Sequence, residues 1–134
     1  MGIQLGIIGY GGMGGFHHRN ASRIEGVQVI GAYDTDPVRV HAAEKNGIKG
    51  FSTLEELLSC DEINTVLVAV PNDKHMELCV EAANAGKHVI CEKPVAMNVR
   101  ELDQMIAAAG RNGKIFTVHQ NRRWDKDFRI VKKI

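Results

Sequence analysis

The sequence predicts an α/β domain built around a doubly wound parallel sheet of about six strands. Three observations lead to this prediction. Apolar runs alternate with helical segments along the chain, a glycine-rich turn follows the first apolar run, and the run VLVAV (residues 66–70) is typical of a strand buried on both faces. Because such crossovers are right-handed, the carboxyl ends of all strands, and any ligand site, are expected along one edge of the sheet.

The predicted strands are short apolar runs, most of them bounded by glycine or polar residues. They lie at residues 3–8, 27–33, 50–52, 66–70, 88–91 and 115–118. The segments between them have helical character, which makes each strand–helix–strand stretch a βαβ unit.

The predicted helices lie at residues 16–23, 37–45, 74–85 and 99–112, with a further helix beginning at residue 127. Pro37 suits a first helical turn, where its missing N–H costs nothing. Thr53 is expected to cap a short helix and to form a capping box with Glu56. Gly86 and Gly113 are expected to end the helices that precede them.

Composition excludes several classes of protein. The 134 residues suit one domain, and 17 basic residues nearly balance 16 acidic ones, so no overall field attracts nucleic acid or an acidic membrane. Arg122, Arg123 and Trp124 form one isolated cluster, which is poor support for nucleic-acid binding. The apolar start at residues 3–10 is too short for a signal peptide or a membrane span.

Cysteine and histidine usage predicts a cellular compartment and disfavours a metal site. The three cysteines are scattered and form no CxxC pair, which indicates a reducing compartment, and we expect a cytoplasmic protein. Cys91 lies in a predicted buried strand and is expected to be a small core residue. No His, Cys and carboxylate group has metal-ligand spacing, so no metal site is expected.

The glycine-rich turn, residues 9–14, matches the G-x-G-x-x-G pattern of dinucleotide-binding domains. An isolated match is weak, but here it follows a strand, precedes a helix, and is followed twenty residues later by Asp34. Gly11 would let the backbone approach a pyrophosphate at the helix N-terminus. Asp34 would accept hydrogen bonds from ribose hydroxyls and repel a 2′-phosphate, which favours NAD, while nearby Arg39 keeps NADP possible.

Beyond the glycines, the chain resembles the N-terminal half of the Gfo/Idh/MocA oxidoreductases, which include glucose–fructose oxidoreductase and inositol dehydrogenases. The matching segments are the glycine turn followed by His17, then Asp34, VAVPNDKH (residues 68–75), GKHVICEKP (86–94) and HQNRRWD (119–125). The GKHVICEKP segment is the most specific of these.

The resemblance implies roles for residues at the sheet edge. It assigns cofactor binding to Gly9, Gly11, Gly12, Met13, Gly14 and Asp34, to Val70, Pro71, Asn72 and His75 after the fourth strand, and to Glu92, Lys93, Asn121 and Arg122. It also implies that Lys93 is catalytic, reaching the substrate, and that the Lys93–Pro94 bond is cis. An ammonium near the reacting carbon would stabilise a developing alkoxide or the carbonyl product.

Plainer roles compete for several of these residues. Lys93 alone would be a solvated lysine at a strand end, and Glu92 is expected more often to anchor neighbouring groups. His17 and His18 suit helix packing, His75 suits a helix cap, and His119 suits a packed strand end as well as it suits a ligand contact.

Residues 1–120 are therefore expected to form an NAD(P)-binding domain, and residues 121–134 the start of a helix towards an absent substrate domain. The resemblance implies hydride transfer between NAD(P) and a sugar, inositol or related polyol, with the catalytic base in the absent domain. We do not expect full catalysis by this chain alone. We do expect a homo-oligomer. A non-catalytic NAD(H)-sensing module and a ligand-free structural domain are the alternatives.

Overall fold

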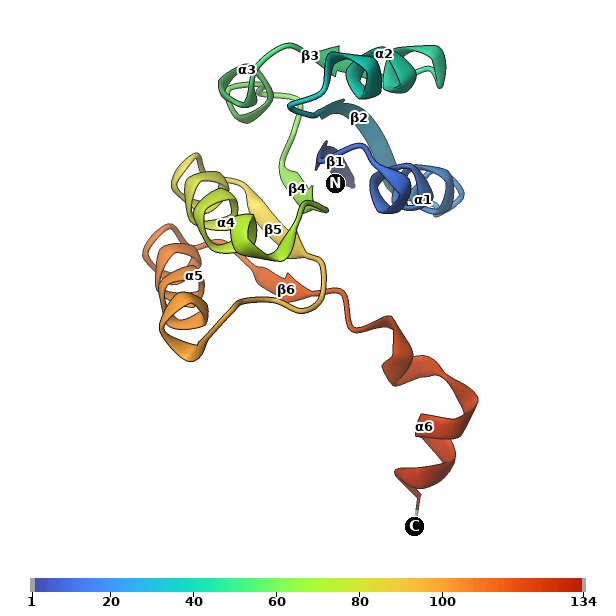
Figure 1. The fold of residues 1–134 in the computed structure, drawn as a ribbon, viewed down its shortest axis with the longest axis vertical. Coiled ribbons are helices and arrows are strands. Elements are labelled where there is room, and N and C mark those ends of the chain that lie inside the picture. Colours follow the sequence, from blue (N-terminus) through green and yellow to red (C-terminus); the bar gives the residue numbers. More distant parts are fainter. Residues whose placement is uncertain (1, 134) are drawn as a thin grey trace.

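The computed structural model describes residues 2–133 and contains a six-stranded parallel sheet with the order β3-β2-β1-β4-β5-β6 (Figure 1). Its strands are β1 (Ile3–Ile8), β2 (Val27–Tyr33), β3 (Lys49–Phe51), β4 (Thr65–Val68), β5 (His88–Cys91) and β6 (Phe116–Val118). The strand order reverses between β1 and β4, so the chain leaves these two adjacent strands in opposite directions. Ligands of open α/β sheets bind at this kind of switch point. The predicted doubly wound fold is confirmed.

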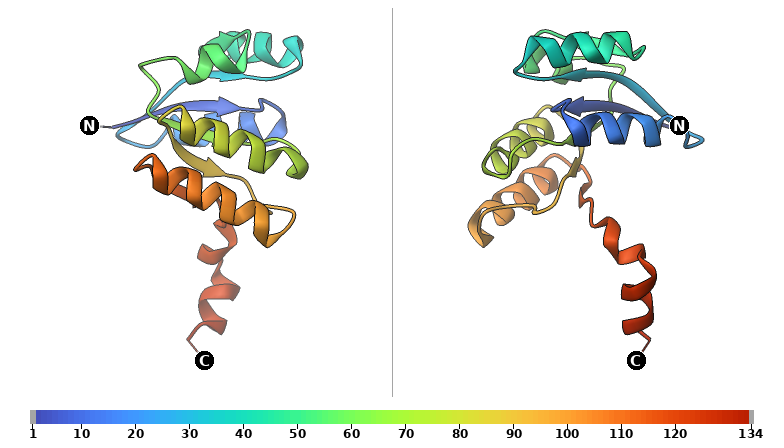
Figure 2. Two further views of the ribbon diagram at one scale, coloured as in Figure 1. Left: turned by 90° about the vertical axis from the view of Figure 1, so that its left-hand side faces the viewer. Right: turned by 45° about the vertical axis from the view of Figure 1, so that its right-hand side comes forward.

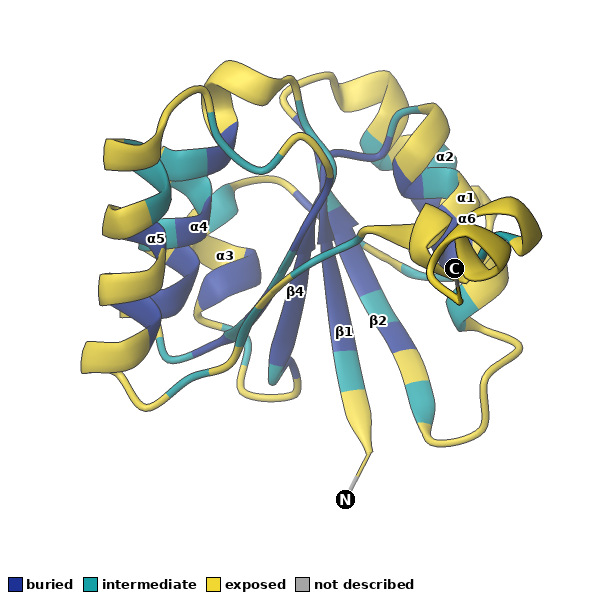
Figure 3. Ribbon diagram, turned by 90° about the horizontal axis from the view of Figure 1, so that it is seen from below, coloured by how far each residue is buried: buried dark blue, intermediate teal, exposed yellow. Residues whose placement is uncertain are grey.

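Helices cover both faces of the sheet (Figure 3). They are α1 (Gly12–Ala21), α2 (Pro37–Lys45), α3 (Leu54–Leu58), α4 (His75–Asn84), α5 (Val99–Arg111) and α6 (Lys126–Val131), with the 3-10 helices η1 (Asn72–Lys74) and η2 (Asn121–Trp124). Helices α3, α4 and α5 pack on one face, and α1 and α2 pack on the other. Both faces of the central strands are therefore buried.

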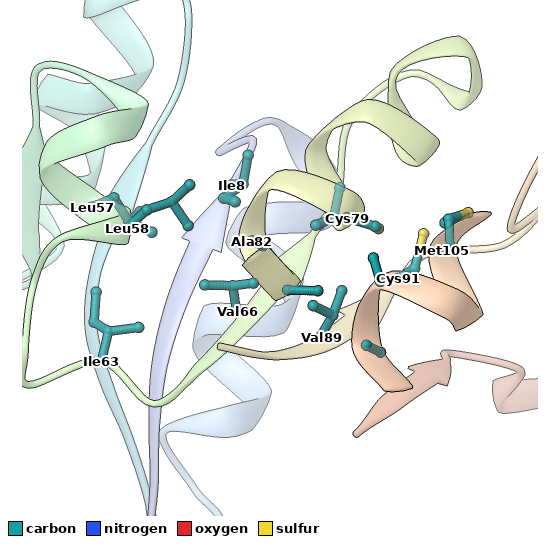
Figure 4. Packing of buried hydrophobic residues seen from close by; sticks show 14 of the residues in the cluster. Ile8, Leu57, Leu58, Ile63, Val66, Cys79, Ala82, Val89, Cys91 and Met105 are labelled. Atoms are coloured by element: carbon teal, nitrogen blue, oxygen red, sulfur yellow. The ribbon is translucent and has the colours of Figure 1, made fainter. Parts of the chain in front are cut away.

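The core consists of two clusters separated by the sheet. Val66 and Val68 of β4 join the cluster under α3, α4 and α5, which also contains Cys91 (Figure 4), whereas Leu67 joins the cluster on the other face. This alternation follows from the period of two residues along a strand. It is the arrangement that a continuous β-branched run predicts.

Most element boundaries lie within two residues of the predicted ones, and α1 shows the largest difference, at its start. It begins at Gly12 rather than at residue 16, because the turn's own backbone forms the first helical bond, from Gly15 N–H to the Gly11 carbonyl at 2.9 Å. Thr53 caps α3 as expected, and its Oγ1 accepts from Glu56 N–H at 3.1 Å. In return, the Glu56 carboxylate accepts from Ser52 N–H, one residue earlier than in a standard capping box.

The last described segment leaves the sheet beyond β6. Helix α6 contacts mainly η2 and projects away from the other helices (Figures 1 and 2). Its apolar side chains are exposed, and so is Trp124, whose relative exposure is 80%. Among residues 2–133, none of the helices has the length and apolar character needed to cross a membrane.

Candidate nucleotide-binding site

The glycine-rich segment of residues 9–14 tolerates only glycine at two of its positions. Gly9 has a φ of +93°, and a Cβ there would overlap the carbonyl of Ala69. A Cβ on Gly14 would overlap the carbonyl of Gly9, so its absence lets α1 approach the strand. Gly11 is the N-cap of α1 and provides no capping side chain. The first-turn N–H groups therefore face the space that the glycines leave open, where an anion is stabilised.

Asp34 follows β2 and is held rigidly against the glycine turn. Its Oδ2 accepts from Tyr10 N–H at 2.8 Å, and its Oδ1 accepts from Asp36 N–H at 2.9 Å. The half-exposed Arg39 guanidinium lies 3.5 Å from the same Oδ2. The buried carboxylate thus has a fixed position between the turn and one half-exposed cation.

A cavity of about 580 Å³ opens in front of the glycine turn, within the usual size range of small-molecule sites. Seven of the predicted cofactor residues line it: Gly9, Gly11, Gly12, Met13, Asp34, Val70 and Pro71. Thr35, Arg39 and Lys74 also line it. Gly14 lies buried beneath the turn, and the cavity sits at the switch point between β1 and β4.

Glu92 and Lys93 lie at the carboxyl end of β5, farther along the same sheet edge. The Glu92 carboxylate is buried and accepts hydrogen bonds from His17 Nε2 at 2.5 Å, His119 Nδ1 at 3.1 Å and Lys93 N–H at 3.1 Å. Burial opposes ionisation, but the His17 and Lys93 hydrogen bonds and the charge of His119 hold the pKa of Glu92 below its ordinary value. Lys93 is exposed, and its bond to Pro94 is cis, as the resemblance implied.

His75 corrects one prediction, because its side chain is fully buried and offers no surface to a cofactor. Its Nδ1 lies 2.9 Å from the Pro94 carbonyl and its Nε2 lies 2.9 Å from the Val70 carbonyl. Carbonyl oxygens only accept, so both ring nitrogens must carry hydrogens. The nearby Cys91 sulfur, with the two carbonyls, raises the pKa of His75 to about 9 against the opposing effect of burial.

Three other predicted residues do not line the cavity. Asn72 is exposed at the start of η1, and Asn121 and Arg122 are exposed in η2 beyond β6. The Arg122 guanidinium lies 3.3 Å from an Asp125 carboxylate oxygen. Their predicted contacts with a cofactor stay predictions.

Sequence reasoning missed the grouping of His17, Glu92 and His119. Their ligand-type atoms lie within 4.8 Å of one another, although Glu92 is 75 residues from His17 and 27 from His119. No local spacing could reveal a group whose members come from three elements and meet only when the sheet forms. The only hint in the sequence was that His17 and His119 suited packing and that Glu92 suited an anchoring role.

Comparison with known proteins identifies the relatives of this chain. A family model described as "Oxidoreductase family, NAD-binding Rossmann fold" (GFO_IDH_MocA) matches residues 3–120. The scyllo-inositol 2-dehydrogenase (NADP(+)) IolU of Bacillus subtilis is 35% identical over 133 residues, which cover 98% of this chain and 40% of that protein.

Solved structures agree with this match. The NAD-binding protein from Listeria innocua is 44% identical with a TM-score of 0.95, over 99% of this chain and 40% of its own. The myo-inositol 2-dehydrogenase from Lactobacillus plantarum is 28% identical with a TM-score of 0.88, over 100% of this chain and 41% of its own. The chain thus spans about 40% of the length of these relatives.

Proposed function

This chain belongs to the Gfo/Idh/MocA oxidoreductase family and is an NAD(P)-binding Rossmann domain. We propose that it is the cofactor-binding domain of a dehydrogenase that acts on a sugar, inositol or related polyol. The observation that carries the proposal is a single sheet edge. It joins the cavity at the glycine turn and Asp34 to the Glu92–Lys93 segment at the end of β5.

The residues at the cavity fit a dinucleotide. Gly11 and Gly12 leave the helix N-terminus open to a pyrophosphate, since a Cβ on Gly12 would meet nothing within 4 Å. Asp34 would bind the adenosine ribose through oxygens already fixed by two backbone N–H groups. Its negative charge favours NAD, and Arg39 beside it provides a partner for the 2′-phosphate of NADP.

When bound, the nicotinamide ring would accept or donate the hydride. Lys93 would supply positive charge next to the substrate oxygen, where it stabilises the alkoxide or carbonyl. Its flexible stem and exposure allow the amine to reach a substrate above the sheet edge. A module that only senses NAD(H) would need the glycines and Asp34 but would have no use for this lysine.

The substrate class rests on the relatives, several of which are inositol dehydrogenases by name. These relatives are longer than this chain, and we propose that the groups completing the substrate site and the proton acceptor lie in the part that it does not span. The 134 residues are then expected to bind NAD(H) and to dehydrogenate myo-inositol slowly or not at all.

Titration of the protein with NADH, followed by nucleotide fluorescence, tests the proposal. Gly11→Val is the decisive variant, because its Cβ would lie an ordinary 3.5 Å from Arg39 in the free protein yet would stand where the pyrophosphate approaches. Gly15→Val, one helical turn away with a comparable 3.4 Å contact, is the matched control. We expect saturable binding by wild type and Gly15→Val and a loss of at least about tenfold for Gly11→Val, the equivalent of one lost charge-assisted contact. Equal binding by all three, or none by wild type, would contradict the proposal.

A further inference from the structure

The Glu92 carboxylate connects three separate parts of the chain at the sheet edge. It lies after β5, His17 lies on α1, and His119 follows β6. Its second oxygen, Oε2, accepts from the backbone N–H of Lys93 at 3.1 Å. One buried charge therefore connects two histidine rings to the backbone of the lysine assigned to the substrate.

The two histidines act on the same oxygen of Glu92. His17 Nε2 and His119 Nδ1 both approach Oε1, and the two rings meet edge to face with centroids 4.6 Å apart. Since an ionised carboxylate only accepts, each of these nitrogens must carry a hydrogen. With Oε1 satisfied by the rings, the orientation of the carboxylate is fixed and Oε2 is aimed at Lys93 N–H.

The distances suit hydrogen bonds better than a shared metal ion. Two histidines and a carboxylate are a familiar zinc set, but ligands around a tetrahedral zinc at roughly 2.1 Å lie about 3.4 Å apart. His119 Nδ1 lies 3.1 Å from the shared oxygen, an ordinary hydrogen-bond distance, and His17 Nε2 lies 2.5 Å from it, well short of the separation between two ligands of one zinc ion.

The other side of the Lys93–Pro94 segment has its own anchor. The Pro94 carbonyl accepts from His75, whose second nitrogen donates to Val70 at the cavity wall. Lys93 is thus held between two fixed points while its side chain is exposed. Because the backbone of Lys93 is held on both sides, the direction in which its long side chain leaves the sheet edge is set, while the side chain itself stays free to reach a substrate.

We propose that His17 and His119 are positioning residues for Lys93, which they hold through the carboxylate of Glu92. The proposal rests on the proposed function, since it assumes that Lys93 serves a bound nucleotide and substrate. Neither histidine lines the cavity, so neither is expected to contribute to nucleotide affinity.

The test uses paired variants of the 134-residue chain that keep or remove each donor atom. His17→Gln places an amide N–H near the Nε2 position, and His119→Asn places one near the Nδ1 position, whereas leucine removes both donors. The swapped pair, His17→Asn with His119→Gln, keeps the polarity but puts each donor at the wrong atom. His41→Leu, an exposed histidine of α2, controls for the loss of a histidine as such.

Three readouts apply to every variant: NADH affinity, hydrogen exchange of the Lys93 amide, and acylation of the Lys93 amine with and without NADH. Peptide mass spectrometry quantifies the acylation, with the exposed Lys45 as internal reference. In wild type we expect NADH to slow acylation of Lys93. In the double leucine variant we expect amide exchange about tenfold faster, as for one lost hydrogen bond, and loss of the NADH protection. The affinity for NADH should change by less than about threefold. The variant that combines His17→Gln with His119→Asn should restore both the slow exchange of the Lys93 amide and its protection from acylation by NADH.

Several results would overturn the proposal. They are unchanged Lys93 exchange and protection in the leucine variant, a loss that the Gln/Asn pair does not rescue, or saturable Zn²⁺ binding that requires all three side chains. If the leucine variant does not fold, the Gln/Asn pair against the swapped pair decides the matter, because both retain polar side chains. If the wild type does not bind NADH, only the proposed function fails. The positioning of Lys93 by the two histidines is still tested, because exchange of the Lys93 amide is measured in the free protein.

Discussion

Asp34 shows how much one side chain can determine at this site. Its carboxylate is fixed by Tyr10 and Asp36 N–H groups before any nucleotide arrives, so little ordering remains to be done on binding. In the proposed complex the acid would present a fixed negative charge to the ribose, with the half-exposed Arg39 cation beside it. We expect these two groups to decide between NAD and NADP.

Replacing Asp34 by Asn should change the preference between NADH and NADPH. We expect NADH affinity to fall roughly 10-fold to 100-fold, because hydrogen bonds to a charged acceptor are worth about 1.5–3 kcal/mol. NADPH should bind relatively better once the repulsion of its phosphate is removed. The ratio of the two dissociation constants is the measurement, since partial unfolding lowers both affinities alike. Asp73→Asn, an exposed acid of η1, is the control, and an unchanged ratio for Asp34→Asn would contradict the assignment.

His75 predicts a specific pH dependence of stability. Its pKa is raised from the ordinary 6.5 to about 9 in the folded protein, so its contribution is present in full below about pH 6.5. That contribution is lost as the pH rises through about 9. The difference in free energy of unfolding between wild type and His75→Gln should therefore shrink from pH 6 to pH 9.5. Titration of the His75 ring by NMR checks the cause, and a folded-state midpoint near 6.5 would contradict it.

At the scale of elements, the strands and helices were largely predictable because their signals are local. Helix α2 and strands β1, β2 and β5 have the predicted bounds. The predicted start of α1 at residue 16 was four residues late, because Gly12, Gly14 and Gly15 have low intrinsic helix propensity and local preference therefore places the start after them. The helix expected at residues 74–85 is α4 (His75–Asn84), one residue shorter at each end, and Lys74 belongs to the 3-10 helix η1 that precedes it.

The N-terminus of α5 offers an element-scale prediction that the sequence did not suggest. Asn98 caps α5 through its Oδ1, which accepts from Glu101 N–H at 3.0 Å, and Glu101 Oε2 accepts from Met97 N–H at 2.9 Å. Asn98→Ala should cost about 1 kcal/mol of unfolding free energy by chemical denaturation. Gln104→Ala, exposed in the middle of α5, should change it by less than about 0.5 kcal/mol. Equal changes in unfolding free energy for Asn98→Ala and Gln104→Ala would contradict a stabilising role for the Asn98 cap.

At the scale of the whole molecule, the fold and half of the predicted site follow from one topology. Parallel strands bring the glycine turn, Asp34 and the Val70–Pro71 segment to one cavity, and each was recognisable from its place after a strand. The cluster around Glu92 and the burial of His75 were not recognisable, because they depend on side chains meeting across elements. The family resemblance identified these residues but not what they contact.

The exposed apolar segment after β6 predicts association between copies of the chain. Trp124 and Phe128 are 80% and 44% exposed on a segment that projects from the domain (Figure 2), and apolar patches of this kind tend to find partners. Light scattering should show a mass that rises with protein concentration. Trp124→Ser with Phe128→Ser should reduce the rise, whereas Val38→Ser, exposed on α2, should not. A constant monomer mass for every variant would contradict this expectation.

The most direct test of the account is hydrogen exchange of backbone amides with and without saturating NADH. If the chain is a nicotinamide-nucleotide-binding domain with Lys93 at its active edge, protection should appear at Gly11–Met13, around Asp34 and at Val70. It should extend along the sheet edge to the Glu92–Lys93 segment. Protection confined to α6, or exchange that NADH does not alter at the glycine turn, would contradict the central claim.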